Sequence, residues 1–248
     1  AAKALNFGTQ KTMRIAQQLY EGVDIKGGGT VGVITYLRTD STRIADEADA
    51  SAREYIASVY GEKYIAAGQT KQAEGKKIQD AHEAIRPTDV TRTPAAVKEF
   101  LSRDQFRLYQ LVWKRFIASR MQPARYETTS VKIAAGQYRF TVAASKIVFE
   151  GFRSVYTEAG ETKEENNVLL KWLDMDSVLT KESLNSKQHF TQPPAHYTEA
   201  TLVKTLEELG IGRPSTYAPT ISTIIARRYV AKENKNLYLT EIGEVVNN

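Results

Sequence analysis

The stretch ITYLRTDSTRI, residues 34–44, leaves an apolar run and enters a polar turn. Alternation over residues 30–37 predicts a β-strand, on which Tyr36 would share a face with Arg38. A phenol is a poor nucleophile at neutral pH because its pKa is about 10, and a neighbouring guanidinium could lower that pKa and bind a phosphate oxygen. An ordinary strand tyrosine stacked on an arginine would have the same spacing, so this stretch alone leaves both interpretations open.

A second polar stretch, DAHEAIRP at residues 80–87, combines two carboxylates with a histidine and an arginine. A protonated His82 could donate a hydrogen bond to a phosphate, and Arg86, four residues later, could share its helical face. The two carboxylates could raise the pKa of the imidazole. A capped turn that holds a histidine with satisfied hydrogen bonds is the competing interpretation.

A third stretch, GIGRPSTY at residues 210–217, has the composition of a phosphate-binding turn. Its two glycines free the backbone and Pro214 stiffens it. Ser215 or Thr216 could cap the following helix, with Arg213 beside the helix N-terminus, where free N–H groups favour an anion. A plain corner between two helices would contain the same residues, so both interpretations stand.

The composition is that of a soluble globular protein with a modest excess of basic residues. A formal net charge of +5 and a pI of about 9.2 suit a polyanionic partner without identifying one. The absence of cysteine excludes disulfides and thiolate zinc sites, and three histidines are too few for a histidine-rich metal site. An acidic pair at residues 174–176 lacks a third carboxylate at matching spacing, so no metal site is expected. No apolar run is long enough to cross a membrane.

The pattern along the chain predicts an α+β protein in three parts: mixed helical at residues 1–122, strand-rich at 123–195 and helical at 196–248. The start without methionine suggests a piece of a longer protein. The expected helices are 9–21, 46–60, 104–121, 199–209 and 217–228; the expected strands are 30–37, 126–134, 137–143, 146–156, 168–173 and 177–185. The apolar stripe of the helix at 104–121 is expected to face the core, and it comprises Phe106, Tyr109, Trp113, Phe116 and Ile117.

Taken together, the three stretches resemble the signature motifs of type IA DNA topoisomerases, and the resemblance runs through the whole chain in order. Leu37 and the AHEAIRP form are more similar to the bacterial topoisomerase I branch than to topoisomerase III. The resemblance implies a winged-helix-like domain carrying the tyrosine at 1–122, part of a β-rich arch at 123–195 and part of a helical DNA-binding base domain at 196–248.

The chemistry implied by this resemblance is transesterification without ATP, which relaxes negative supercoils. Tyr36 would attack a phosphodiester of single-stranded DNA, form a 5′-phosphotyrosine and release a 3′-hydroxyl. Arg38 would hold the scissile phosphate and His82 would support it. The residues expected to bind or orient the DNA backbone are Arg213, Ser215, Thr216, Asp40 and Arg86.

The resemblance also implies a divalent metal that this chain does not hold. In the family a separate Toprim domain binds Mg²⁺ through an acidic triad, and no Asp-x-Asp-x-Glu pattern occurs here. We therefore expect Mg²⁺ and a Toprim partner domain in the full-length enzyme, no cofactor in this chain and no efficient DNA cleavage by the chain alone. A monomer in the bacterial cytoplasm, associated with the nucleoid, is expected. The alternatives are a non-catalytic module that binds single-stranded DNA and a structural or interaction protein.

Overall fold

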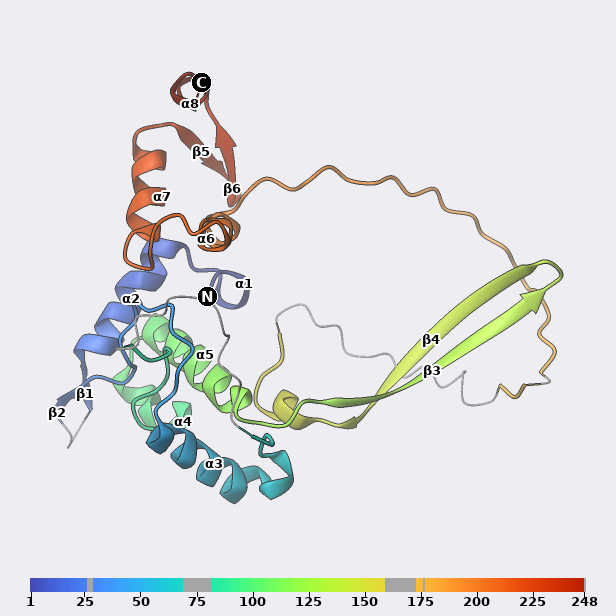
Figure 1. Ribbon diagram of the computed structural model, residues 1–248, viewed down its shortest axis with the longest axis horizontal. Helices are drawn as coiled ribbons and strands as arrows, with labels where there is room; N and C mark the ends of the chain where they lie inside the picture. The colour runs from blue at the N-terminus through green and yellow to red at the C-terminus, as the bar shows by residue number, and fades with distance from the viewer. Residues whose placement is uncertain (26–28, 69–81, 159–172, 176, 248) are drawn as a thin grey trace.

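The computed structural model describes residues 1–25, 29–68, 82–158, 173–175 and 177–247, and it has the expected mixture of helices and strands. Figure 1 shows a helical body, a long hairpin that projects from it, and a C-terminal segment stacked on the body beside helix α2. The winged-helix, arch and base descriptions, with their boundaries, stay predictions. Among the described residues, every helix is too short or too polar to span a lipid bilayer.

The helical body holds one hydrophobic core, drawn from residues between Phe7 and Val155. Its helices pack around α5, whose apolar stripe turns inward as predicted: Tyr109 and Ile117 are fully buried. The elements are α1 (Ala2–Leu5), α2 (Thr9–Glu21), β1 (Val23–Ile25), β2 (Gly29–Val31), α3 (Asp46–Tyr60), η1 (Glu62–Tyr64), α4 (Pro94–Val97), η2 (Lys98–Phe100) and α5 (Arg103–Ser119).

The helices of the body begin and end at residues that cap their free backbone groups or break the helical conformation. Helix α5 begins after a capping box in which Ser102 and Gln105 satisfy each other's backbone N–H groups. Helix α4 begins at Pro94 and is capped by the Thr93 side chain. Helix α3 ends at Gly61, whose φ of 94° is unfavourable for other residues.

The predicted strand at 30–37 is wrong in extent. Only Gly29–Val31 forms a strand, β2, which pairs with β1 in an antiparallel ribbon. Beyond it the chain stays extended but changes partner, since Ile34 forms an isolated bridge with Pro87. Val33 and Ile34 are both buried, so the expected alternation of faces does not hold. The physical reason is that the two sides of this segment are covered by different parts of the body.

The strand-rich part is one long antiparallel hairpin of β3 (Arg125–Ala135) and β4 (Tyr138–Phe149), closed at Gly136 with φ of 61°. The strands predicted at 137–143 and 146–156 are therefore wrong as separate elements: β4 covers the first, continues to Phe149, and is followed by the short helix η3 (Gly151–Ser154). Gly151 is required there because a Cβ would collide with the backbone of Gln122 and Pro123.

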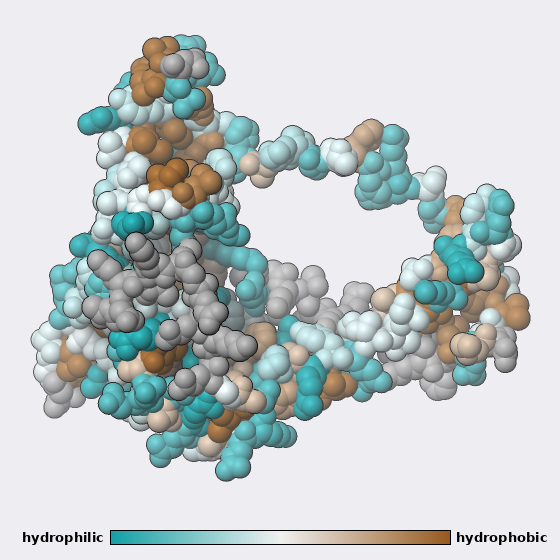
Figure 2. All heavy atoms as spheres, viewed as in Figure 1, coloured by the Kyte–Doolittle hydropathy of each residue, from teal (hydrophilic) through white to brown (hydrophobic). Residues whose placement is uncertain are grey.

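Residues 177–197, which follow the hairpin, form no helix or strand. The strand predicted at 177–185 is wrong, because residues 177–197 form no ladder and are almost entirely exposed. The strand predicted at 168–173 lies outside the described residues except for its last position. Figure 2 shows residues 177–197 as a single file of side chains, leading to the C-terminal segment.

The C-terminal segment contains more than helices. Two helices predicted from the sequence are present, α6 (Glu199–Glu208), capped by Thr198, and α7 (Tyr217–Ala226). An unpredicted hairpin follows, built of β5 (Val230–Glu233) and β6 (Asn236–Leu239), and α8 (Glu241–Asn247) comes last. Helix α7 packs on α2, and this contact places the C-terminal segment against the body.

Candidate functional site

The first two sequence motifs lie side by side in the structure. The Thr35 N–H donates to the Arg86 carbonyl at 2.9 Å, and the Arg86 N–H donates to Thr35 Oγ1 at 2.9 Å. The Ala84 N–H donates to the Arg43 carbonyl at 2.8 Å. These bonds hold the segments before and after Tyr36 against residues 82–88, so two stretches about fifty residues apart form one surface.

Helix α2 supports this surface from the other side. The Val33 N–H donates to the Leu19 carbonyl at 2.8 Å. Gly32 lies so close to the helix that a Cβ on it would be 2.5 Å from the Tyr20 carbonyl oxygen. The end of α2 therefore fixes the chain directly before Tyr36.

The Tyr36 ring lies between two other rings. His82 is stacked on it, with ring centroids 5.3 Å apart and planes 28° apart. Tyr20, from the last turn of α2, meets it edge to face at 5.5 Å and 69°. Both geometries are favourable for aromatic pairs. Tyr36 is only partly buried, so the two contacts orient the ring without enclosing it.

The turn after Tyr36 presents a cation to solvent. The Arg38 side chain is exposed, as is Asp40 two residues later. The turn is held from within, since the Ser41 N–H donates to Thr39 Oγ1 at 3.0 Å and the Arg43 N–H donates to Ser41 Oγ at 3.2 Å. Ser41 is buried, so this turn is anchored while its charged residues face outward.

The third motif is a tight turn between α6 and α7. The Arg213 N–H donates to Thr216 Oγ1 at 2.9 Å, and that hydroxyl donates to the Arg213 carbonyl at 3.1 Å. Gly210 and Gly212 have φ values of 70° and 79°, which glycine tolerates best. Arg213 Nη1 donates to the Gly212 carbonyl at 3.1 Å, and the side chain is otherwise exposed.

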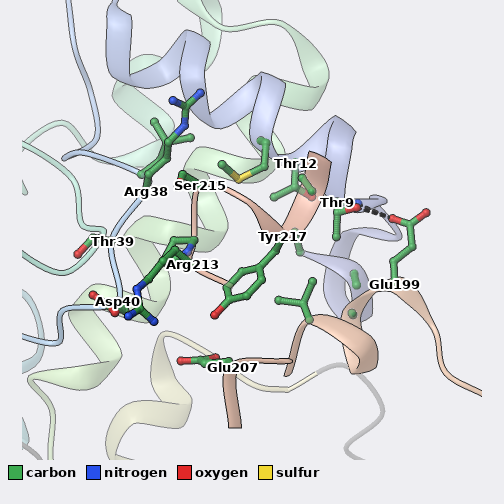
Figure 3. A pocket seen from close by; sticks show the side chains of 18 of the residues that line it. Thr9, Thr12, Arg38, Thr39, Asp40, Glu199, Glu207, Arg213, Ser215 and Tyr217 are labelled. Atoms are coloured by element: carbon green, nitrogen blue, oxygen red, sulfur yellow. Dashed lines mark hydrogen bonds between the residues drawn. The ribbon is translucent and has the colours of Figure 1, made fainter. Parts of the chain in front are cut away.

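The three motifs meet in one cavity of about 980 Å³ between the body and the C-terminal segment (Figure 3). Its wall on the body side includes Tyr36, Arg38, Asp40 and His82, and the opposite wall includes Arg213, Ser215, Tyr217, Glu199 and Glu207. Of the predicted site residues, Thr216 and Arg86 do not line the cavity. The Thr216 hydroxyl closes the turn that carries Arg213.

Arg86 has a structural environment. Its Nε donates to Glu83 Oε2 at 2.8 Å and its Nη1 donates to the Pro87 carbonyl at 3.0 Å, and its side chain is only 13% exposed. Burial alone would raise the pKa of Glu83, but the hydrogen bond and charge of Arg86, with the Ala45 N–H and Arg43, lower it overall. Glu83 thus pairs with arginine rather than with His82. The DNA-binding role of Arg86 stays a prediction.

Comparison with known proteins agrees with the motifs. A family model described as DNA topoisomerase matches residues 1–248, the whole of this sequence. The chain belongs to the type IA DNA topoisomerase family.

A solved structure of full-length topoisomerase I from Thermotoga maritima is similar to this type IA topoisomerase chain. The two are 41% identical, with a TM-score of 0.80 over 99% of this chain. The match covers 39% of the Thermotoga chain, so our sequence spans less than half the length of that relative.

Sequence reasoning about this topoisomerase assigned no role in the site to Glu199 and Tyr217, which line the cavity, or to Tyr20, whose ring contacts Tyr36. Glu199 follows the capping residue Thr198, and acidic residues are common in the first turn of a helix, so its sequence position does not distinguish it. Burial raises the pKa of Tyr217, Glu207 and Asp40 raise it further, and Arg213 partly opposes them. No local pattern indicates the contacts of Glu199, because its partners Thr9 and Lys232 are distant in sequence.

The described part of this topoisomerase chain does not fit a metal site. It contains no group of three histidine, aspartate or glutamate side chains able to surround an ion. The expectation that Mg²⁺ is held outside residues 1–248 stays a prediction.

Proposed function

We propose that this chain carries the nucleophile and the backbone-binding groups of a type IA topoisomerase, which breaks and rejoins one DNA strand. A single observation supports it best: one cavity is lined by the phenol of Tyr36, an imidazole and two exposed guanidinium groups. A phosphodiester placed there would have a nucleophile on one side and cations on both walls.

The proposed step is a transesterification on single-stranded DNA. The Tyr36 Oη forms a bond to phosphorus and loses its proton, while the bond from phosphorus to the 3′ oxygen breaks and that oxygen gains a proton. The products are a 5′-phosphotyrosine and a free 3′-hydroxyl. Attack by this hydroxyl reverses the step, so the ester conserves the energy of the broken bond and ATP is not needed.

The roles of the other groups follow from their positions. Arg38 and Arg213 would neutralise phosphate charge from opposite walls, since a guanidinium binds two phosphate oxygens at once. His82, stacked on Tyr36, would donate to a phosphate oxygen or to the departing 3′ oxygen. Asp40 would orient the turn, and Ser215 would donate to the backbone of the bound strand.

The test uses an oligonucleotide labelled at its 3′ end and the full-length enzyme that contains these residues. The label should become covalently attached to protein in the parent and not in Tyr36→Phe, while both bind the oligonucleotide equally. Tyr138→Phe, at an exposed position near the hairpin tip, is the matched control and should keep the adduct. An adduct in Tyr36→Phe would overturn the proposal. Equal binding without any adduct in the parent would favour the non-catalytic binding module.

A second measurement concerns residues 1–248 alone. We propose that this chain binds single-stranded DNA weakly and forms no adduct, even with Mg²⁺ present, because its described residues provide no metal site. A robust adduct through Tyr36 in the isolated chain would contradict this part of the proposal. Sedimentation should give a monomer.

A further inference from the structure

Glu199 connects two parts of the chain that are 190 residues apart. Its Oε2 accepts hydrogen bonds from the Thr9 N–H and from Thr9 Oγ1, both at 2.7 Å (Figure 3). Its Oε1 accepts a hydrogen bond from Lys232 Nζ in strand β5. Three donors from two elements therefore meet on one carboxylate that belongs to a third element, helix α6.

The carboxylate takes the place of a missing helix cap. Helix α2 begins at Thr9 after Gly8, which has no side chain to bond the first N–H groups. A Cβ on Gly8 would lie 3.1 Å from Glu199 Oε2, so the carboxylate packs directly on this helix end. A negative charge at this end is also favoured by the helix dipole.

Charge and burial make this contact stronger than an ordinary surface pair. The Glu199 side chain is 15% exposed. Burial would raise its pKa, but the hydrogen bonds from Lys232 and Thr9 and the charge of Lys232 lower it overall. The group is therefore ionised at neutral pH, and its hydrogen bonds are charge-assisted.

The contact lies between the two walls of the cavity. Thr9 begins the helix whose last turn supports Tyr36, and Glu199 begins the helix that leads to Arg213. Thr9 and Glu199 themselves line the cavity. Helix α7 also packs on α2, and its Ala218 and Ile221 side chains are buried.

We propose that Glu199 is a positioning residue whose carboxylate holds α6 on the N-terminus of α2, and so sets the separation between Arg213 and Tyr36. The contact itself is independent of the proposed function, and only its effect on catalysis rests on that function. Apolar packing tolerates sliding, whereas two hydrogen bonds to one residue fix a direction. Loss of the carboxylate should therefore loosen the cavity rather than unfold either wall.

The first test is a distance measurement that needs no activity. The chain has no cysteine, so spin labels can be placed on introduced pairs without background. Ala50→Cys on α3 and Thr223→Cys on α7 are exposed and report on the two walls. The parent should give a narrow distance distribution, and Glu199→Ala a broader one with a longer mean. Glu208→Ala, an exposed carboxylate on the same helix, should match the parent.

Graded variants separate positioning from folding. Thr9→Val removes one of the two threonine donors, and Glu199→Gln keeps an oxygen acceptor but loses the charge. Both should broaden the distribution less than Glu199→Ala. If Glu199→Ala fails to fold, Thr9→Val and Glu199→Gln provide the test instead. A distance distribution equal to that of the parent in both variants would overturn the proposal.

The second test uses the full-length enzyme. In Glu199→Ala the concentration of single-stranded DNA needed for half-maximal adduct should rise about tenfold, the size expected from losing charge-assisted hydrogen bonds. The adduct rate at saturating DNA should change less. A broadened distance distribution with an adduct that persists in Tyr36→Phe would refute the proposed function and leave the positioning role intact. An unchanged distribution would refute the positioning role alone.

Discussion

The imidazole of His82 lies stacked on the phenol of Tyr36, with ring centroids 5.3 Å apart, although 45 residues separate them in the chain. The backbone bonds between Thr35 and Arg86 place the two rings in contact. The pair stands on the cavity wall opposite Arg213. The fold thus holds an imidazole beside the proposed nucleophile.

His82→Phe tests whether the imidazole contributes chemistry as well as packing. The variant keeps a stacked ring but loses both ring nitrogens, so adduct formation in the full-length enzyme should slow about tenfold or more. Binding of single-stranded DNA should stay within about twofold. His82→Ala, which also removes the ring contact, should be slower still. Parent-like rates in His82→Phe would restrict this residue to packing.

Tyr20 should act on Tyr36 through its ring and not its hydroxyl. An edge-to-face pair contributes about 0.5–1.5 kcal/mol, so Tyr20→Ala should slow adduct formation roughly two- to tenfold. Tyr20→Phe preserves the edge and should behave as the parent. The measurement is the single-turnover rate at saturating oligonucleotide, with Tyr138→Ala as the control for loss of an exposed tyrosine ring. Equal rates in Tyr20→Phe and Tyr20→Ala would argue against orientation by this ring.

Arg213 and Arg86 should respond differently to substitution. Arg213 is exposed in the cavity, so Arg213→Ala should weaken binding of single-stranded DNA and reduce the salt dependence by about 0.7 in log–log slope, the value for one phosphate contact. Arg86 is held by Glu83 and the Pro87 carbonyl, so Arg86→Ala should instead cost about 1–3 kcal/mol of stability.

Salt titration and chemical unfolding of both variants distinguish these outcomes. A reduced salt slope in Arg86→Ala, with stability unchanged, would support the sequence-based prediction that Arg86 binds DNA. Lys235→Ala, an exposed cation in the turn of the C-terminal hairpin, serves as the control for removal of one positive charge outside the cavity.

Asp49 should contribute much of the stability of the helical body. Its two oxygens bind Arg53 Nε at 2.6 Å and Arg120 Nη1 at 3.0 Å, and the Arg120 side chain is only 8% exposed. Asp49→Ala removes the carboxylate that pairs with the buried Arg120 guanidinium. This variant should therefore lower the free energy of unfolding by about 2–4 kcal/mol. Asp46→Ala, an exposed aspartate in the same first turn, should cost under about 1 kcal/mol. Urea unfolding of both variants provides the comparison.

The same carboxylate predicts a pH dependence. Burial alone would raise the pKa of Asp49, but hydrogen bonds and charges from Arg53 and Arg120 lower it overall. A carboxyl with a lowered pKa in the folded state contributes fully above its unfolded pKa of about 3.9, and this contribution is lost as the pH falls through the folded value. Stability should therefore fall below about pH 4, and the fall should be shallower in Asp49→Asn. Parallel curves for parent and variant would contradict this assignment.

Local signals in the sequence were enough to place most helices. Helices α2, α3, α5 and α6 were predicted from the pattern of residues along each segment. Their hydrogen bonds join residues four apart, so the information lies within each segment. The three motifs were also visible without a structure, since each is a contiguous run of residues.

Strands and the shape of the site depended on partners far along the chain. The sequence pattern at 30–37 predicts one strand, but its first residues pair with β1 and Ile34 pairs with Pro87. This change of partner depends on how the body packs. The hairpin of β5 and β6 is short and has little alternation to reveal it. A strand requires a neighbour, and nothing in its own residues says which neighbour it will have.

The sequence by itself indicated the family, most of the helices and the proposed reacting groups, because each of these is encoded in contiguous residues. Only the tertiary structure decided that Tyr36, His82 and Arg213 line one cavity and that Arg86 does not. It also placed Glu199 on Thr9, 190 residues away. Such contacts arise when whole helices pack against each other, and packing depends on the complete set of surfaces that the folded chain brings together.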